Sequence, residues 1–142
     1  MTRIDFYTSA EPKLQVACQL VIKAVRQSLC VLICAPDDTT ARAIDRLLWT
    51  FPATGFIPHC MARDRLAGET PVLIALAGEE TAQNQVLVNL APESPTAFGR
   101  FQRLIEIVGT DPEERQAGRT RYRYYRDLGY EVGHIDLGKP AP

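Results

Sequence analysis

The run Leu29-Cys30-Val31-Leu32-Ile33-Cys34 decides the fold. It is continuous, apolar and rich in β-formers, and it is short enough for a strand that is buried on both faces. Upstream, residues 3–8 alternate polar and apolar side chains, which predicts a half-buried strand. Between the two, apolar residues recur at helical spacing from Pro12 to about Ser28, with Ser9 or Glu11 near the cap. Strand, helix and buried strand form a βαβ unit, which predicts a partly parallel sheet covered by helices.

The rest of the chain continues this pattern. Asp37-Asp38-Thr39-Thr40 predicts the start of a second helix, which Pro52 and Gly55 end. Asp111-Pro112-Glu113-Glu114 predicts a last helix that stops at Gly129. We expect strands at 56–60, 71–76, 86–90, 105–108 and 130–137, a loop at 63–70, a short helix from Pro95 through Phe98, Phe101 and Leu104, and fraying at 138–142. One α/β domain over residues 1–142 accounts for all of these elements.

Composition limits the function. A chain of 142 residues with 46% hydrophobic residues can fill a core without metal or disulfides. A net charge of −1 gives no general attraction to nucleic acid or membranes. The four cysteines form no C-x-x-C motif, and buried thiols in a reducing cytosol explain them. We find no signal peptide and no apolar run near the ~20 residues of a membrane span, which predicts a cytoplasmic protein.

No catalytic, metal or cofactor site is predicted. The turn Thr8-Ser9-Ala10-Glu11-Pro12 lacks glycine, and Asp37 and Asp38 stand where a nucleotide phosphate would bind at the second helix. His59 and His134 belong to no metal-spacing motif, so we interpret both as structural. A small nucleotide-binding enzyme with a Rossmann-like fold is kept as a third hypothesis.

Residues 44–59 gather large aromatic side chains at the junction between a helix and a strand. The stretch holds Trp49, the only tryptophan, with Phe51, Phe56 and two prolines, Pro52 and Pro58. Aromatic residues at such a junction either fill a core or face a partner. Considered without the rest of the chain, the stretch favours the first interpretation, in which these side chains fill the core.

The last helix is basic and aromatic. Residues 115–126 carry five arginines, three tyrosines and no acid. The expected outer face holds Arg115, Arg119, Tyr122, Arg123 and Arg126, and the expected sheet face holds Ala117, Tyr124, Tyr125 and Leu128. The outer face is interpreted in three ways: a solvated surface, a surface for single-stranded nucleic acid, or a pocket for an acidic peptide.

The two stretches together resemble the chi subunit of bacterial DNA polymerase III, and the resemblance runs along most of the chain. It is weak around 62–68 and 78–85. It is carried by Phe6-Tyr7, Val31-Leu32-Ile33, Leu47-Leu48-Trp49, Pro52-Ala53, Phe56-Ile57-Pro58-His59, Gly68, Pro71-Val72, Arg121-Tyr122-Arg123-Tyr124-Tyr125-Arg126 and Gly129-Tyr130.

The resemblance implies a three-layer α/β/α, Rossmann-like domain around a mostly parallel sheet. It also implies a non-catalytic subunit that binds the psi subunit and, through psi, the clamp loader. The second implied partner is the acidic C-terminal tail of the single-stranded DNA-binding protein, so contact with DNA would be mostly indirect. Direct binding of single-stranded nucleic acid by the last helix is the alternative.

The implied site residues form two groups. Trp49, Phe56 and Pro58 match the psi-facing surface. The tail-binding pocket is matched by Val108, Arg119, Tyr122 and Arg123. The family pattern has lysine where Arg123 stands, which keeps the charge but replaces a point charge by a planar fork.

Overall fold

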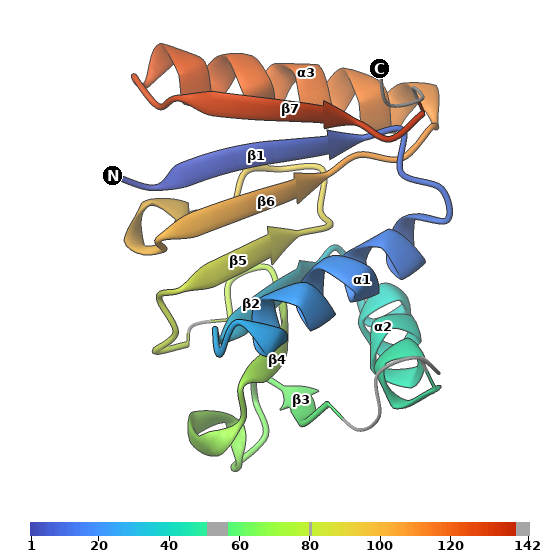
Figure 1. Cartoon of the computed structure of the whole chain (residues 1–142), viewed down its shortest axis with the longest axis vertical. Helices are drawn as coiled ribbons and strands as arrows, with labels where there is room; N and C mark the ends of the chain where they lie inside the picture. The colour runs from blue at the N-terminus through green and yellow to red at the C-terminus, as the bar shows by residue number, and fades with distance from the viewer. Residues whose placement is uncertain (51–56, 80, 139–142) are drawn as a thin grey trace.

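The computed structural model describes residues 1–50, 57–79 and 81–138. In these residues seven strands form a single sheet in the order β3-β4-β2-β5-β6-β1-β7, and every pairing is parallel (Figure 1). The strands are β1 (Arg3–Thr8), β2 (Val31–Ala35), β3 (His59–Met61), β4 (Val72–Leu76), β5 (Val86–Asn89), β6 (Arg103–Ile107) and β7 (Val132–Asp136).

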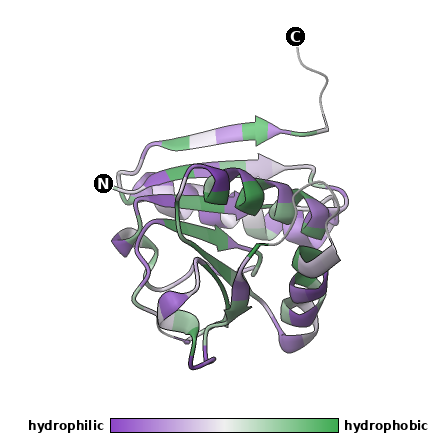
Figure 2. Ribbon diagram, turned by 60° about the horizontal axis from the view of Figure 1, so that its bottom comes forward, coloured by the Kyte–Doolittle hydropathy of each residue, from purple (hydrophilic) through white to green (hydrophobic). Residues whose placement is uncertain are grey.

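Helices cover both faces of the sheet. The helices α1 (Lys13–Arg26) and α2 (Asp38–Thr50) lie on one face, and α3 (Pro112–Asp127) lies on the other (Figure 1). On the first face Val21 and Ile44 pack in one cluster with Ile33, and on the second face Tyr125 packs in another cluster with Phe6. The three-layer α/β/α architecture is therefore confirmed. Figure 2 shows the apolar residues concentrated along the central strands.

Local signals set both ends of α3 and the start of α2 as predicted. The Asp111 side chain accepts a hydrogen bond of 2.8 Å from the Glu113 N–H, and Gly129 after the helix has a φ of +94°. Asp37 Oδ1 accepts from the Thr40 N–H at 2.7 Å. At α1, Ser9 or Glu11 was expected near the cap. Pro12 is itself the cap residue, with extended backbone and no capping side chain, and Glu11 directly precedes it.

The short helix expected from Pro95 through Leu104 is also wrong. Only a single 3-10 turn forms, at Phe98–Arg100, and Leu104 lies inside β6. Leu104 is fully buried and is in register with Ile4 on one side and Leu87 on the other. Pairing with two neighbouring strands outweighs the helical spacing of the apolar residues.

The strand β3 is shorter than expected. Residues 56–60 were predicted to form a strand, whereas β3 covers His59–Met61. The loop at 63–70 contains a 3-10 turn at Ala67–Glu69. The predicted ending of the second helix at Pro52 and Gly55 lies outside the described residues; the helix is described to Thr50.

Candidate functional site

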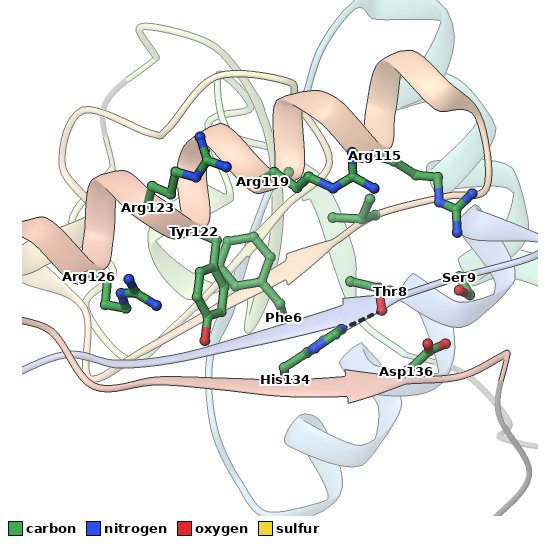
Figure 3. Close-up of a pocket in the computed structure, with 12 residues that line it drawn as sticks. Phe6, Thr8, Ser9, Arg115, Arg119, Tyr122, Arg123, Arg126, His134 and Asp136 are labelled. Carbon is green, nitrogen blue, oxygen red and sulfur yellow. Dashed lines mark hydrogen bonds between the residues drawn. The ribbon is translucent and has the colours of Figure 1, made fainter.

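A pocket of about 370 Å³ lies between α3 and the carboxyl ends of β1 and β7 (Figure 3). It brings together all four residues that the resemblance assigned to tail binding: Val108, Arg119, Tyr122 and Arg123. The other residues that line it are Phe6, Thr8, Ser9, Arg115, Gly118, Arg126, His134 and Asp136. We call it the α3–β7 pocket.

The floor of the α3–β7 pocket is apolar. Val108 is buried directly after β6, and the Phe6 and Tyr122 rings pack edge to face with centroids 5.5 Å apart. Gly118 lies above Val108, and a Cβ atom at position 118 would be only 2.9 Å from Val108 Cγ2. Glycine at this position therefore allows α3 to lie close to the floor.

The wall formed by α3 is cationic. Arg115, Arg119, Arg123 and Arg126 are exposed and follow one another along the helix on the pocket side (Figure 3). Three of them, Arg115, Arg119 and Arg123, make no ion pair within the described residues. The fourth, Arg126, lies over the Tyr122 ring, 5.9 Å from its centroid. These guanidinium groups are available to an anionic ligand.

The opposite wall comes from the ends of β1 and β7. His134 in β7 is hydrogen-bonded to Thr8 Oγ1 in β1 at 2.7 Å. Asp136 is the one carboxylate among the described lining residues, and its Oδ1 accepts from the Gly138 N–H at 2.9 Å. Four arginines against one aspartate make the pocket strongly positive in a chain of net charge −1.

The predicted sheet face of α3 needs correction. Tyr125 is fully buried as expected, but Tyr124 is 48% exposed and Leu128 is 51% exposed. Gly118 and Arg121 face the sheet in their place. Arg121 is buried because the sheet carries an acid that pairs with it.

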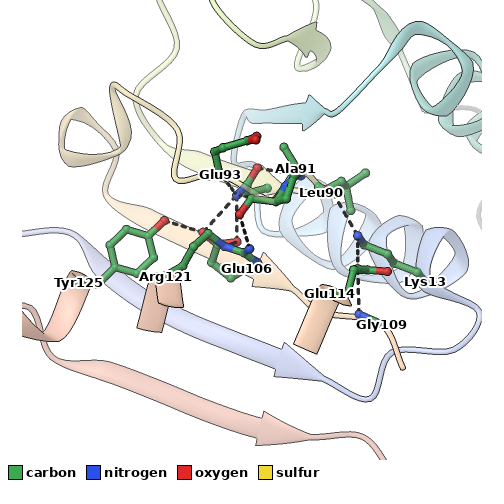
Figure 4. Close-up of polar contacts among 11 residues, drawn as sticks. Lys13, Leu90, Ala91, Glu93, Glu106, Gly109, Glu114, Arg121 and Tyr125 are labelled. Carbon is green, nitrogen blue, oxygen red and sulfur yellow. Dashed lines mark hydrogen bonds and ion pairs between the residues drawn. The ribbon is translucent and has the colours of Figure 1, made fainter. Parts of the chain in front are cut away.

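That acid is Glu106 in β6, which is fully buried (Figure 4). Arg121 Nε donates to its Oε1 at 3.0 Å, and the Tyr125 hydroxyl donates to its Oε2 at 2.5 Å. Asn89 Nδ2 donates to both carboxylate oxygens at 3.0 and 3.1 Å. Arg121 also donates from Nη1 to the Pro92 carbonyl at 2.7 Å. This network joins α3 to β5 and β6.

Burial raises the pKa of Glu106 to about 7, and the donors around it act in the opposite direction. Sequence reasoning missed this residue. The available signal was Ile105-Glu106-Ile107, an acid in a strand that is expected to be buried.

Within the aromatic stretch, Trp49 lies at the surface and does not fill the core. The Trp49 side chain is 58% exposed at the end of α2, and its ring packs edge to face on the His59 ring at 4.9 Å. Pro58, which directly precedes His59 in the sequence, is also exposed. Phe56, the third residue assigned to psi binding, lies outside the described residues.

His59 has a structural position beneath this surface. The residue is 8% exposed, and its Nδ1 is hydrogen-bonded to the Ile57 carbonyl at 2.7 Å. Its Nε2 lies 3.2 Å from Asp45 Oδ1, within ion-pair distance, but the geometry makes no hydrogen bond.

The cysteines are less buried than expected. Cys18 is buried, whereas Cys30, Cys34 and Cys60 are half-buried, and all four are free thiols. Burial raises the pKa of Cys18 and of Cys34 to about 11. In the described ranges no cluster of three or more metal-ligating side chains occurs, and none of the helices has the length and apolarity to cross a membrane.

Comparison with known proteins identifies relatives along most of the chain. A sequence model of the family described as "DNA polymerase III chi subunit, HolC" matches residues 1–133. The DNA polymerase III subunit chi of Pseudomonas aeruginosa is 40% identical over 136 residues, which cover 93% of this chain and 94% of that protein. The subunit chi of Escherichia coli is 27% identical over 132 residues, covering 92% and 88%.

Solved structures of a different class share the fold. The C-terminal domain of the DEAD-box protein Dbp5 has a TM-score of 0.68 at 15% identity, covering 98% of this chain and 92% of that one. S. cerevisiae Dbp5 bound to RNA and ADP BeF3 has a TM-score of 0.67 at 16% identity, covering 95% and 41%. At such identities the likeness extends to the fold alone.

Proposed function

The chain belongs to the DNA polymerase III chi subunit family, and from this premise we propose that it is a non-catalytic adaptor with two separate binding surfaces. Members of the family are subunits of DNA polymerase III and act in DNA replication. In our proposal the α3–β7 pocket binds the acidic C-terminal tail of the single-stranded DNA-binding protein. The surface around Trp49 binds the psi subunit, which connects the chain to the clamp loader.

One observation supports the tail proposal above all. In one pocket, exposed arginines of α3 that make no ion pair in the described structure form a wall beside an apolar floor. An acidic peptide that ends in an apolar residue needs both features. The arginines bind the carboxylates in the forked geometry that guanidinium groups favour, and Val108 and Tyr122 contact the terminal side chain.

The test is fluorescence anisotropy with a labelled peptide of the tail. Arg119→Ala and Arg123→Ala should each weaken binding about 10- to 100-fold, because a hydrogen bond to a charged group contributes about 1.5–3 kcal/mol. Arg26→Ala, which removes the same charge on the opposite face of the sheet, should have little effect. If the wild-type chain shows no binding at low salt, the tail proposal is wrong.

The psi proposal is supported by the exposure of Trp49 and Pro58 near β3, at one edge of the sheet. Exposed tryptophans are frequent hot spots of protein interfaces, where truncation costs about 2 kcal/mol or more. Trp49→Ala should therefore weaken psi binding at least about 30-fold in calorimetry and leave the melting temperature nearly unchanged. Leu128→Ala, a similarly exposed apolar residue on the other face, is the control. Unfolding of the Trp49→Ala chain would instead identify Trp49 as a core residue.

Direct binding of single-stranded DNA is the second candidate. The same pocket offers guanidinium groups beside the partly exposed Tyr122 ring, which could stack on a base. Anisotropy with a labelled oligonucleotide separates the candidates. DNA binding tighter than tail binding, with a steep salt dependence, would favour this function over the adaptor.

A further inference from the structure

The strand β7 leaves one edge of the sheet open. It pairs with β1 and, within the described residues, with no other strand. The Leu137 N–H donates to the Thr8 carbonyl at 2.9 Å. Because peptide groups alternate in direction along a strand, those of Gly133 and Ile135 point to β1. The peptide groups of His134 and its alternate neighbours therefore point away from the sheet.

This edge has few of the features that protect exposed strands. Val132–Asp136 contains no proline and no lysine, and its register with β1 is continuous, without a bulge. Ile135 is 42% exposed. An edge of this kind is a template for pairing with another extended chain.

The open edge lies beside the arginines of α3. His134 and Asp136 of β7 line the same pocket as Arg115 and Arg126 (Figure 3). Arg126 lies eleven positions after Arg115, so the row extends ~16 Å along the helix at ~1.5 Å per residue. An extended peptide covers that distance with ~5 residues.

We propose that an acidic peptide enters the α3–β7 pocket as an added strand, whose backbone pairs with the open edge of β7. Alternate side chains of the peptide then meet the arginines of α3. The inference rests on the tail-binding function proposed above and specifies how the peptide is held. Charge favours this occupant over a second copy of the chain, because a second copy would bring its own arginine row to the same interface.

A pair of variants at position 134 isolates the backbone contribution. His134→Ala and His134→Pro both remove the ring that contacts Thr8, but only proline removes the N–H that points outward. Proline is tolerated on an edge strand where its position makes no ladder hydrogen bond. In anisotropy with the labelled tail peptide, we expect His134→Pro to bind about tenfold more weakly than His134→Ala. Equal affinities of the two variants overturn the proposal.

Peptide variants give a second measurement that leaves the protein unchanged. Two peptides have the same terminal apolar residue and six preceding positions that alternate aspartate and alanine, starting with aspartate in one and with alanine in the other. A strand presents only one of these registers to the arginines, so the affinities should differ at least fivefold. Equal affinities would show that the peptide is not held as a strand.

The outcomes separate the two levels of the proposal. Tail binding by the wild type, with no effect of register and no difference between the two His134 variants, keeps the tail function and rejects the added strand. No tail binding by the wild type rejects both. Self-association of the chain that His134→Pro abolishes, with peptide binding unchanged, assigns the edge to a second copy and also rejects the added strand.

Discussion

A methionine in place of Arg121 would leave Glu106 as a buried carboxylate without its cation. Arg121 is 5% exposed and Glu106 is fully buried, so solvent cannot replace the lost partner. Methionine retains most of the apolar stem. What is lost is the charge, the 3.0 Å hydrogen bond to Glu106 and the 2.7 Å hydrogen bond to the Pro92 carbonyl.

Removing one partner of a buried ion pair costs about 3–5 kcal/mol. Tyr125 and Asn89 still donate to the carboxylate, so we expect the lower end, about 3 kcal/mol, at pH 8. The free-energy cost of Arg121→Met should rise with pH. The pKa of Glu106 is about 7 in the folded protein against 4.5 for the free group, and loss of Arg121, which lowers it, raises it further.

A raised pKa means that the folded state binds the proton more tightly than the unfolded state. Stability is then fully present below the unfolded pKa and is lost as pH rises, by at most about 1.4 kcal/mol per pH unit, until the folded pKa is passed. At pH 5 the carboxyl group is protonated in the wild type and in the variant. The cost of Arg121→Met should therefore be smaller at pH 5 than at pH 8, by up to about 1.4 kcal/mol, because pH 8 lies about one unit above the wild-type pKa of Glu106.

Urea unfolding followed by circular dichroism at pH 5 and pH 8 measures both costs. Arg119→Met, which replaces an exposed arginine on the same helix, is the control and should change the free energy of unfolding by less than about 0.5 kcal/mol at both values. The reasoning is refuted if Arg121→Met costs under about 1 kcal/mol at pH 8, or costs the same at both pH values.

Three further changes test neighbouring features. Tyr125→Phe removes the hydroxyl that donates to Glu106 and should cost about 1.5–3 kcal/mol at pH 8 in urea unfolding; an unchanged midpoint would contradict the network. Gly118→Ala places a Cβ atom 2.9 Å from Val108 Cγ2 and should cost about 1–3 kcal/mol by overpacking, with part of the loss recovered in the double variant with Val108→Ala. Asp111→Ala removes the cap of α3 and should lower stability by about 1 kcal/mol, which a melting curve that matches the wild type would disprove.

Features that depend on neighbours in sequence could be predicted. Asp111 and Gly129 mark the ends of α3 through caps that need no distant contact, and the apolar run around Val31 has the composition of a doubly buried strand. Leu104 could not be assigned, because its state depends on pairing with two strands that are far away in sequence. Arg121 was placed on neither face of the last helix, because the sequence does not show that Glu106 lies beneath it.

From residue spacing alone, only the helical side of the candidate pocket could be predicted. Helical spacing brings Arg119, Tyr122 and Arg123 to one face, and Val108, which only the family resemblance assigned to the pocket, lies among the lining residues with them. The opposite wall could not be predicted, since the contact between Thr8 and His134 joins positions separated by 126 residues. The roles of these residues, and of Trp49, Phe56 and Pro58, remain predictions that the binding experiments test.

The strand order has a consequence for how two partners would be held together. Trp49 contacts His59 in β3 at one edge of the sheet, and the α3–β7 pocket lies at the other edge. Seven strands leave six gaps of ~4.8 Å, so the two edges are ~29 Å apart. Partners at these edges would not compete for space. The domain would hold the two partners at a fixed separation. Binding of one partner would then keep the other at a high effective concentration nearby, and this effect needs no coupling between the two sites.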